Sequence, residues 1–405
     1  MYIPSKKLAE SIVDQYGTPV FVTNADIIRD RAKSLLEAFS DTSMKMFYAI
    51  KANYNPHIVR VIKNSGIYGI DAVSPNEIQL ALELGYLPEQ IIFTPSNPSE
   101  EEMRFAGEKG VLQNLGSLSE LMRFGKMFSG AKVSIRISPE VGAGECAKVV
   151  TGDSESKFGV TLEQMDDVRK IVQRYQLHLI GIHSHVGSGF YQTKEFTASV
   201  KAVCAVARTF PEVSILDFGG GFGVEYYPNK KGIQLESFAR ALQPIVRRFE
   251  QETKREVELR IEPGKFLVTQ STVLLARVTT IKEKKGNIFV GVDAGFYNLI
   301  RPAMYGAYHH IVNVSRPRSK KQRVKVVGNV CETCDVFNEG IDIKMCHEKD
   351  IIAILCSGGY GSAMSSLYTM RPFAPEILIE GKKKILTRKR QSYEEMMSNF
   401  TPFEK

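Results

Sequence analysis

The sequence predicts an α/β protein with a (β/α)8 barrel followed by a C-terminal β domain, and three observations support this prediction. Short β-rich runs alternate with longer amphipathic stretches over the first two-thirds of the chain, which indicates βα units. These runs number eight, the number of strands in such a barrel. After Glu262 the pattern changes to β-rich runs separated by turns, which predicts a second domain with its own sheet.

The expected barrel elements follow one another in regular order. Strands are expected at Lys45–Ile50, Ile67–Val73, Ile91–Thr94, Val111–Asn114, Lys132–Ile137, Leu179–His185, Ser214–Phe218 and Leu259–Glu262. Helices are expected at Ala25–Phe39, Pro75–Leu84, Ser119–Phe128, Leu162–Tyr175, Phe196–Phe210 and Leu235–Glu250. A doubly wound open sheet is the alternative fold, but it would carry a Gly-rich phosphate loop after its first strand, where this chain has KANYNP.

The later part of the chain contains strand-like runs at Phe266–Ile281, Asn287–Val292, Arg323–Val327 and Ile351–Leu355. We therefore expect a barrel domain over residues 22–265. We expect a β-sandwich or β-barrel domain over residues 266–405, which also includes residues 1–21.

The composition is that of an ordinary globular protein. Of the 405 residues, 43% are hydrophobic and 24% are charged, a balance that disfavours disorder and fibrous repeats. No apolar run approaches the roughly 18 residues that a membrane span needs, and the N-terminus lacks the apolar stretch of a signal peptide. We expect a cytoplasmic protein without a membrane partner, whose six cysteines are free thiols unless they bind metal or do chemistry.

The net charge of +8 comes from two basic clusters, at residues 316–325 and 382–390. A nucleic-acid surface usually combines basic residues with a recognisable module or with interleaved aromatic residues, and neither accompanies these clusters. Charge runs of this kind are more often solvated edges that discourage strand pairing. We therefore expect no nucleic-acid partner.

Polar side chains end several of the expected barrel strands, where the active site of a barrel lies. Lys51 follows the apolar run of FYAIKAN, and shielding from water would give it a neutral amine able to form a Schiff base. A surface lysine with a snorkelling side chain would give the same pattern.

Two histidines, His183 and His185, share one face of the sixth expected strand. They could bind a metal ion, but a metal site needs further ligands. We therefore expect no bound metal. An imidazole can instead stack on a planar cofactor. Gly187 and Ser188, which follow, offer N–H groups and a hydroxyl to an anion.

The seventh and eighth expected strands end in a glycine run and a carboxylate. Gly219, Gly220 and Gly221 let the backbone approach a ligand closely and precede a helix, which favours phosphate, although a tight turn explains the same run. Glu262 needs a partner at the barrel mouth. A protonated ring nitrogen of a cofactor would serve, and so would an internal arginine such as Arg136.

The C-terminal part holds further candidates. Cys331 and Cys334 occur in VCETC. A zinc site would need a second pair of ligands, and a thioredoxin-like redox motif would need an adjacent βα unit, and neither accompanies these cysteines. A single reactive cysteine is therefore the preferred interpretation. Compact loops rich in Gly, Arg and Tyr suit a charged small molecule. Such loops contain Asp293, Arg301, Tyr305, Glu332 and Tyr360.

A shielded lysine, a stacking histidine, phosphate-binding loops and a carboxylate for a ring nitrogen together meet the requirements of pyridoxal phosphate. The motifs that hold them resemble those of diaminopimelate decarboxylases, within the alanine-racemase-like barrel class of pyridoxal phosphate enzymes. The resemblance extends from about Tyr16 to Glu376, with the motifs in family order. It rests on FYAIKAN, HSHVGSG, LDFGGGFG, EPGK, DAGFYNLIRPAMYGAYH, CET and GGYGSAMSSLYTMRP.

The resemblance implies a carboxy-lyase that uses pyridoxal 5′-phosphate to convert meso-2,6-diaminopimelate to L-lysine and carbon dioxide, the last step of lysine biosynthesis by the diaminopimelate pathway. Lys51 would hold the cofactor as a Schiff base, and His185 would stack on its ring. Glu262 would keep the ring nitrogen protonated, which strengthens the electron sink and favours decarboxylation over racemisation. The phosphate would be held by Ser188, Gly220, Gly221 and Tyr360.

The same resemblance implies the substrate site. Cys331 would be the general acid that reprotonates the α-carbon, supplied to the neighbouring subunit of a homodimer with shared active sites. Glu332 would receive the distal ammonium of the substrate, and its distal carboxylate would be held by Arg301 and Tyr305. Lys265 and Tyr360 complete the substrate-binding residues that the resemblance implies.

The chain departs from the family pattern at a few positions beside the substrate site. Lys265 replaces the usual Arg and lacks its planar fork, so anion binding there is expected to differ. Tyr297 and Asn298 stand where Asn and Asp are common, and Cys334 stands where Gly is usual. These departures bear more on substrate identity than on the cofactor.

Two alternatives remain open. A related decarboxylase could act on another basic amino acid, such as ornithine, arginine or carboxynorspermidine, but a plain diamine precursor offers no distal carboxylate to Arg301. A non-enzymatic pyridoxal phosphate binder would typically lack the Schiff-base lysine or the acid cysteine, and this chain has both Lys51 and Cys331.

Overall fold

The computed structural model describes residues 1–401 except 143, 147, 149, 153–155 and 231. The chain divides into two compact units. The barrel unit comprises Arg29–Val224 and Gly232–Leu267, and the β unit comprises Met1–Ile28, Glu225–Lys231 and Val268–Lys405. Among the described residues, no helix combines the length and the apolar character that crossing a membrane requires.

The barrel unit contains eight parallel strands that form a closed barrel, because the last strand pairs with the first. This confirms the predicted barrel. The strands are β2 (Lys45–Ala49), β3 (Gly69–Ala72), β4 (Ile91–Phe93), β5 (Leu112–Leu115), β6 (Lys132–Arg136), β7 (His178–His183), β8 (Ile215–Asp217) and β9 (Glu258–Ile261).

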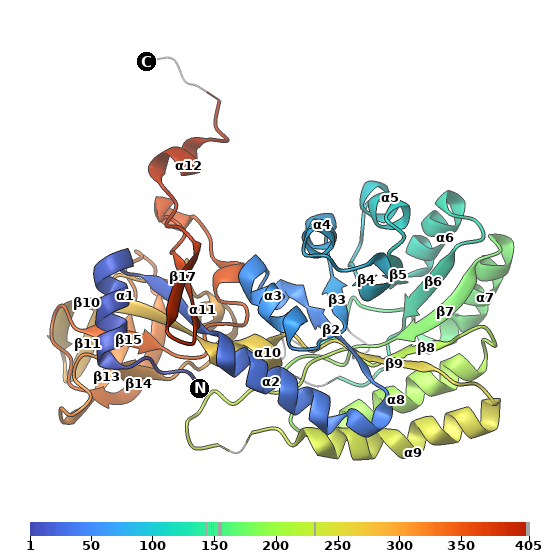
Figure 1. Cartoon of the computed structure of the whole chain (residues 1–405), viewed down its shortest axis with the longest axis horizontal. Coiled ribbons are helices and arrows are strands. Elements are labelled where there is room, and N and C mark those ends of the chain that lie inside the picture. The colour runs from blue at the N-terminus through green and yellow to red at the C-terminus, as the bar shows by residue number, and fades with distance from the viewer. Residues whose placement is uncertain (143, 147, 149, 153–155, 231, 402–405) are drawn as a thin grey trace. The chain divides into compact units, whose positions relative to one another are not determined.

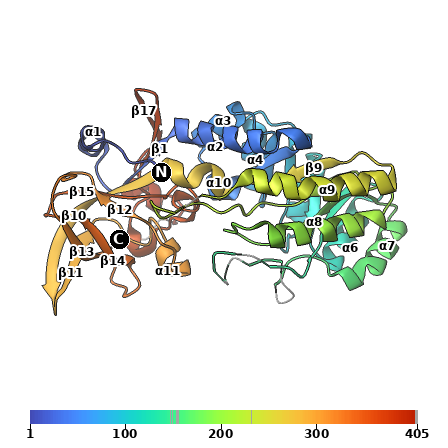
Figure 2. The same ribbon diagram turned by 90° about the horizontal axis from the view of Figure 1, so that it is seen from below.

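Helices surround the outside of this barrel (Figures 1 and 2). They are α2 (Ala25–Ala38), α3 (Pro56–Asn64), α4 (Pro75–Glu83), α5 (Glu100–Glu108), α6 (Leu118–Met127), α7 (Met165–Arg174), α8 (Thr193–Arg208), α9 (Leu235–Thr253) and the short α10 (Lys265–Val268). Several begin at signals that the sequence supplies. Ser99 and Glu102 form a capping box at α5, and the Ser74 hydroxyl accepts a hydrogen bond from Glu77 at the start of α4.

A cluster of phenylalanines fixes the loops that follow β7 and β8. Phe190 and Phe222, one from each loop, are joined by a β-bridge and pack against Phe238 of α9, with ring centroids 5.7 and 5.6 Å from it. Phe196 of α8 completes the cluster, 5.4 Å from Phe238. Because these rings are buried, they hold the glycine-rich turn before Phe222 in a defined position.

The β unit is built on a nine-stranded mixed sheet. Seven strands form the path β14-β13-β11-β10-β1-β16-β17, and β15 pairs with both β10 and β12. Their bounds are β1 (Val20–Asn24), β10 (Thr272–Lys284), β11 (Asn287–Val292), β12 (Ile311–Asn313), β13 (Lys321–Val327), β14 (Val336–Lys344), β15 (Ile351–Ile354), β16 (Glu376–Glu380) and β17 (Lys383–Arg388). Its helices are α1 (Lys6–Tyr16), α11 (Arg301–Tyr305) and α12 (Tyr393–Met397).

Short 3-10 helices connect several elements of both units. They lie at Ser40–Thr42, Ile50–Ala52, Pro88–Gln90, Leu162–Gln164, Thr269–Ser271, Ser362–Met364 and Tyr368–Met370.

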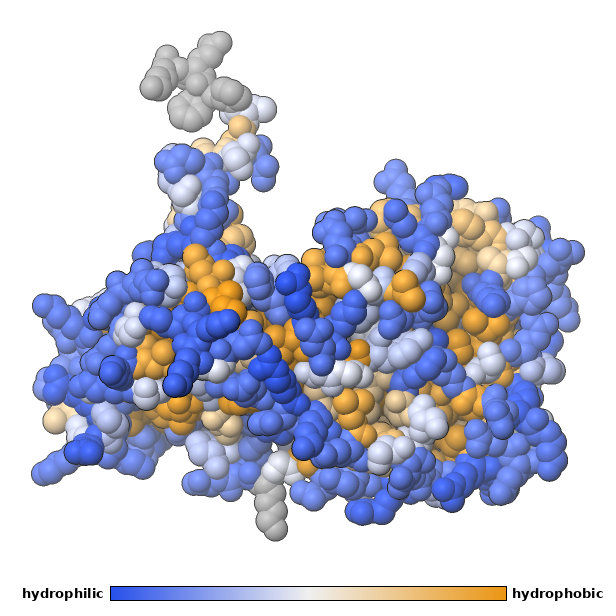
Figure 3. All heavy atoms as spheres, viewed as in Figure 1, coloured by the Kyte–Doolittle hydropathy of each residue, from blue (hydrophilic) through white to orange (hydrophobic). Residues whose placement is uncertain are grey.

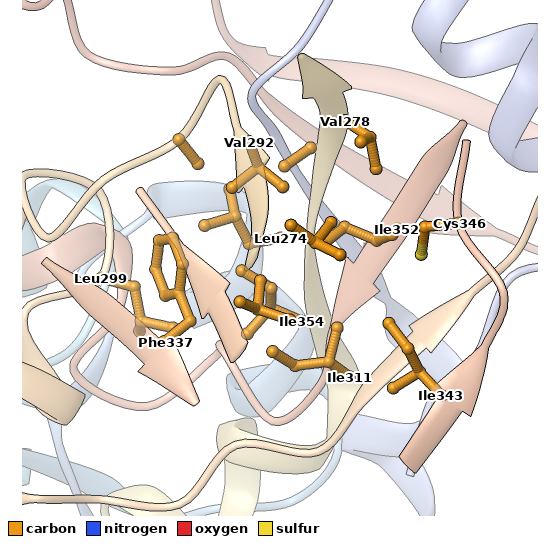
Figure 4. Packing of buried hydrophobic residues seen from close by; sticks show 14 of the residues in the cluster. Leu274, Val278, Val292, Leu299, Ile311, Phe337, Ile343, Cys346, Ile352 and Ile354 are labelled. Carbon is orange, nitrogen blue, oxygen red and sulfur yellow. The ribbon is translucent and has the colours of Figure 1, made fainter. Parts of the chain in front are cut away.

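The core of the β unit is a dense apolar cluster between its strands (Figure 4). Leu274 of β10, Ile352 and Ile354 of β15 and Val292 of β11 are at most 1% exposed. Phe337 of β14 packs into the same cluster. Burying side chains of this size contributes roughly 1.5–3 kcal/mol each, so this cluster is a main source of the stability of the unit.

Two expected boundaries differ from the structure. The barrel domain was expected to begin at residue 22, but β1, which spans that position and was not expected as a strand, pairs with β10 and β16 of the β unit. The expected strand at Phe266–Ile281 begins as helix α10 and becomes β10 only at Thr272. Residues 266–276 of this run are all buried, so they carry no alternation of exposed and buried positions from which strand and helix could be distinguished.

The two basic clusters lie on the β unit, and several of their side chains pair with carboxylates. Arg316 pairs with Asp350 at 2.9 Å, and Lys325 pairs with Glu339 of the neighbouring strand at 3.4 Å. The second cluster lies along β17, an edge strand of the sheet. Hydrophilic side chains also cover most of the molecular face drawn in Figure 3. These contacts give the clusters a structural role at strand edges.

Candidate active site

The first feature of the barrel mouth is an ion pair between Lys51 and Asp71. Lys51 lies in the 3-10 turn directly after β2, and Asp71 lies in the neighbouring β3. Their Nζ and Oδ2 atoms are 2.8 Å apart; the Asp71 side chain is fully buried, whereas that of Lys51 is 39% exposed. The buried carboxylate thus orients an amine whose tip a ligand can reach.

The second feature is a buried acidic group at the ends of β7, β8 and β9. Nε2 of His183 is 3.1 Å from Oε2 of Glu262, and Asp217 lies beside them on β8, in register with His183. Burial raises the pKa of Glu262 to about 8, with the Asp71 carboxylate adding to the rise and Lys51 opposing it. Burial likewise raises the pKa of Asp217 to about 7 and lowers that of His183 to about 4, which keeps the imidazole neutral.

The structure leaves this acidic group incomplete. Among the described residues, Oε1 of Glu262, Oδ2 of Asp217 and Nδ1 of His183 are buried without a hydrogen-bond partner. Ligand atoms of the three side chains lie within 4.8 Å of one another, a spacing that suits either a metal ion or a protonated ring nitrogen. The nearby Arg136 and Arg260 oppose a doubly charged ion more strongly than a singly charged one. A protonated ring nitrogen is therefore the better partner.

His185 meets the glycine turn after β8. The backbone N–H of Gly220 donates to Nδ1 of His185 at 3.1 Å, which makes Nδ1 an acceptor and leaves the proton on Nε2. Burial lowers the pKa of His185 well below its ordinary value, and the charges of Arg136 and Lys51 add to the effect. His185 is thus a neutral ring held in one orientation, as stacking on a planar group requires.

The glycine turn itself tolerates no side chain. A Cβ on Gly220 would lie 1.9 Å from the carbonyl oxygen of Glu262, and one on Gly221 would lie 2.0 Å from that of Gly187. The N–H of Gly189 donates to the Gly221 carbonyl at 2.8 Å, so the loop that holds Ser188 packs directly on this turn. A close-packed backbone cradle of this kind is suited to phosphate.

Lys265 lies in the barrel unit with a side chain that is only 4% exposed. Its Nζ is 2.8 Å from Oε1 of Glu145, a residue of the segment that follows β6. The sequence did not single out Glu145, and the structure pairs the two charges.

Arg301 and Tyr305 begin and end helix α11 in the β unit. The Arg301 side chain is 2% exposed, and its guanidinium lies over the rings of Tyr226 and Tyr305, with Cζ 5.3 and 6.0 Å from the centroids. Both rings fix the plane of the guanidinium, which suits recognition of a carboxylate.

Cys331 and Glu332 occupy the exposed loop between β13 and β14. Tyr368, which the sequence analysis did not single out, donates from its hydroxyl to Oε1 of Glu332 at 2.6 Å. Tyr360 has a positive φ of 59°, a conformation that residues with a side chain rarely adopt and that is common at functional sites.

The structure thus brings Lys51, His185, Gly220 and Glu262 together at the carboxyl ends of the barrel strands. Arg301 and Tyr305 form a second group on α11, and Cys331 and Glu332 a third in the β unit. Besides Glu145 and Tyr368, sequence analysis missed Asp71, the next-to-last residue of β3, and Asp217, the last residue of β8. The position of the two aspartates at strand ends was the available signal.

The chain has close relatives among known proteins. Residues 25–269 match the family model described as the pyridoxal binding domain of pyridoxal-dependent decarboxylases. The chain is 36% identical to a diaminopimelate decarboxylase of Methanothermobacter thermautotrophicus, an alignment that covers 96% of this chain and 93% of the relative.

Solved structures agree with this relationship. A crystal structure of a diaminopimelate decarboxylase superposes with a TM-score of 0.90 at 32% identity and covers 98% of both chains. The Helicobacter pylori enzyme of that name, complexed with L-lysine, gives a TM-score of 0.88 at 29% identity and covers 96% of this chain and 98% of its own.

Proposed function

Since the chain belongs to the diaminopimelate decarboxylase family, we propose that the residues at the barrel mouth hold pyridoxal 5′-phosphate and that those of the β unit select the substrate. The reaction is the decarboxylation of meso-2,6-diaminopimelate to L-lysine and carbon dioxide, so the protein is a carboxy-lyase of lysine biosynthesis. The observation that carries the proposal is the incomplete acidic group at Glu262, beside an oriented lysine and a glycine cradle.

Each barrel residue has a distinct task toward the cofactor. Lys51 would hold it covalently through its amine, which Asp71 orients. His185 presents a neutral imidazole face to its ring. Glu262 would hold the ring nitrogen with one carboxylate oxygen, while its other oxygen is in contact with Nε2 of His183. The phosphate is received by Ser188, Gly220, Gly221 and Tyr360.

When bound, pyridoxal phosphate accepts the electron pair that departing carbon dioxide leaves on the α-carbon. The negative charge of Glu262 keeps the ring nitrogen protonated and so makes that acceptance favourable. Glu262, His183 and Asp217 are buried, so little water screens the attraction between the Glu262 carboxylate and a protonated ring nitrogen.

The β unit supplies the proton and the specificity. Cys331 delivers a proton to the α-carbon, and its exposed position in its own chain supports delivery to the site of a second subunit. Glu332 binds the distal ammonium, and Arg301 and Tyr305 bind the distal carboxylate. Lys265 and Tyr360 contribute to the substrate side, with Glu145 positioning the ammonium of Lys265.

Arg301 supports diaminopimelate over ornithine, arginine or carboxynorspermidine. Its guanidinium is buried and held in plane by two aromatic rings. A bidentate cation of this kind matches a carboxylate at the far end of the substrate, which a diamine precursor lacks. The proposal also includes a homodimer with shared active sites, located in the cytoplasm.

A spectrum and a turnover assay on one sample test the proposal. The purified protein is expected to show the visible absorbance of lysine-bound pyridoxal phosphate and to release carbon dioxide from meso-diaminopimelate but not from ornithine or arginine. Lys51→Ala should lose both signals. Absorbance without carbon dioxide release from diaminopimelate would contradict the assigned substrate, and no absorbance after addition of the cofactor would contradict the role of Lys51.

A further inference from the structure

A cavity of about 510 Å³ lies within the β unit. It is lined by residues 3–6 at the start of α1, by residues 310–314 in and around β12, by residues 342–344 of β14, and by Pro317 and Lys321. None of the described residues that line it is assigned to the cofactor or to the substrate. Small-molecule sites typically have volumes of roughly 300–1,000 Å³, so this cavity is large enough for a metabolite.

Part of the cavity lining is apolar. Ile311 and Ile343 line the cavity and also belong to the core cluster of the β unit (Figure 4). Pro4, which is buried, lines it from the segment before α1. A bound molecule would therefore contact aliphatic side chains, which favours a ligand with a carbon chain over a bare inorganic ion.

Two lysines of the lining face each other across neighbouring strands. Lys321 of β13 is the direct antiparallel partner of Lys344 of β14. Directly opposed side chains lie on the same face of a sheet, and like charges in that arrangement are destabilising. Among the described residues, neither lysine pairs with a carboxylate, whereas Arg323 of β13 pairs with Asp342 at 3.6 Å. The lysine pair is thus a concentration of positive charge that a bound anion would neutralise.

The rest of the lining adds to this positive potential. Lys6, which forms an exposed pair with Glu10 at 3.7 Å, lines the cavity at the first residue of α1, where the helix carries partial positive charge. Burial and the charge of Lys321 lower the pKa of His310, so this ring is neutral at pH 7. Three lysines and one aspartate, Asp342, therefore give the lining a net charge of +2.

The cavity lies at the far end of the β13–β14 hairpin from the loop that holds Cys331 and Glu332. Lys321 begins β13 and Lys344 ends β14, whereas the loop follows Val327 at the other end of β13. Six steps of about 3.3 Å along β13 give a separation of about 20 Å. Binding in the cavity can thus be measured separately from binding at the proposed active site.

We propose that this cavity binds a small aliphatic dicarboxylate. One carboxylate lies between Lys321 and Lys344, and the other lies at Lys6 and the amino end of α1. The carbon chain packs on Ile311 and Ile343. Two carboxylates match the net charge of +2, and burial of the chain distinguishes this ligand from inorganic phosphate.

Isothermal titration calorimetry of the holoenzyme with adipate tests the proposal. Adipate should bind with a Kd below about 1 mM. Adipamide and 1,6-diaminohexane have the same number of carbon atoms without the negative charges, so neither should bind. Inorganic phosphate should bind at least about 10-fold more weakly than adipate, because it has no chain to bury.

Matched substitutions test whether adipate binds in the cavity. Lys321→Gln and Lys344→Gln should each weaken adipate binding about 10-fold through loss of a charge-assisted contact. Lys282→Gln on β10 is the control, because it removes the same charge outside the cavity and should leave the affinity unchanged. Arg301→Ala should also keep the affinity, which separates this cavity from the proposed substrate site.

The ligand-free protein provides a second measurement. Lys344→Gln should raise the urea midpoint of unfolding, because it removes the repulsion from Lys321 across the strand pair. An unchanged or lower midpoint would show that the two lysines are not in electrostatic conflict, and the reason for a bound anion would be lost.

Several calorimetric results would overturn the inference. Absence of adipate binding, or an unchanged affinity in both Lys321→Gln and Lys344→Gln, would show that the cavity is not a dicarboxylate site. Loss of binding in Arg301→Ala would assign adipate to the substrate site instead. Phosphate that binds as tightly as adipate would remove the carbon chain from the proposal. Failure to decarboxylate diaminopimelate would contradict the proposed function, but it would not alter these binding results.

Discussion

Replacing Glu262 by Gln should weaken catalysis and stabilise the cofactor-free protein at the same time. A hydrogen bond to a charged group contributes about 1.5–3 kcal/mol, so losing the charge opposite the ring nitrogen should lower kcat roughly 10- to 150-fold. Gln keeps the shape of Glu and an oxygen for the contact to His183. The variant should therefore still bind pyridoxal phosphate.

The stabilisation follows from the ionisation of Glu262 in the cofactor-free protein. Burial raises the pKa of Glu262 from 4.5 to about 8, so at pH 7 folding requires the carboxyl to take up a proton. One pKa unit is about 1.4 kcal/mol, which gives a cost of about 3 kcal/mol at pH 7. Because the folded pKa of Glu262 is raised, this group costs the wild type no stability below pH 4.5, and its cost grows as pH rises toward 8. The Gln variant does not titrate, so its advantage should grow over that range.

Urea unfolding of the cofactor-free proteins at several pH values measures this difference. Glu258→Gln on the same strand is the matched control. Burial would raise the pKa of Glu258, but its hydrogen bond to Lys45 and the charge of Arg260 outweigh burial and lower it, so this carboxylate stabilises the fold above its unfolded pKa. Glu258→Gln should thus destabilise the protein at neutral pH. If Glu262→Gln brings no gain in stability at pH 7, the carboxyl is not an uncompensated buried acid; if kcat is unchanged, Glu262 does not act on the ring nitrogen.

Three further substitutions test other parts of the site. Cys331→Ala should keep the cofactor absorbance and lower kcat about 10²–10⁴-fold, and an unchanged kcat in stopped-time carbon dioxide assays would refute its acid role. Arg301→Ala should raise KM for diaminopimelate about 10- to 100-fold, with a smaller effect on kcat, because it loses a charge-assisted contact to the substrate. A wild-type KM would contradict the proposal that Arg301 binds the distal carboxylate. Gly220→Ala should weaken pyridoxal phosphate binding in fluorescence titration, because its Cβ would lie 1.9 Å from the Glu262 carbonyl oxygen. Gly232→Ala is the control and should bind the cofactor normally, because a Cβ there would meet no atom within 4 Å.

The sequence allowed the barrel strands and several site residues to be predicted because both depend on local pattern. The β-rich runs and the amphipathic stretches between them are each defined by a few neighbouring residues, so β2 to β9 could be located by inspection. Lys51 and Glu262 were identifiable because polar residues at the ends of apolar strands are unusual. The helical start of the run at Phe266 was not identifiable, since complete burial removes the exposed positions on which a periodicity depends.

The partners of those residues were decided only by the tertiary structure. Lys51 meets Asp71, Glu262 meets His183, and Lys265 meets Glu145, across separations of 20, 79 and 120 residues. No local rule predicts such pairs, because they arise when barrel closure and the segment after β6 bring distant residues into contact. Residue types at strand ends were therefore enough to predict candidate site residues. The pKa shifts and orientations of those side chains come from burial and from neighbours that only the folded chain supplies.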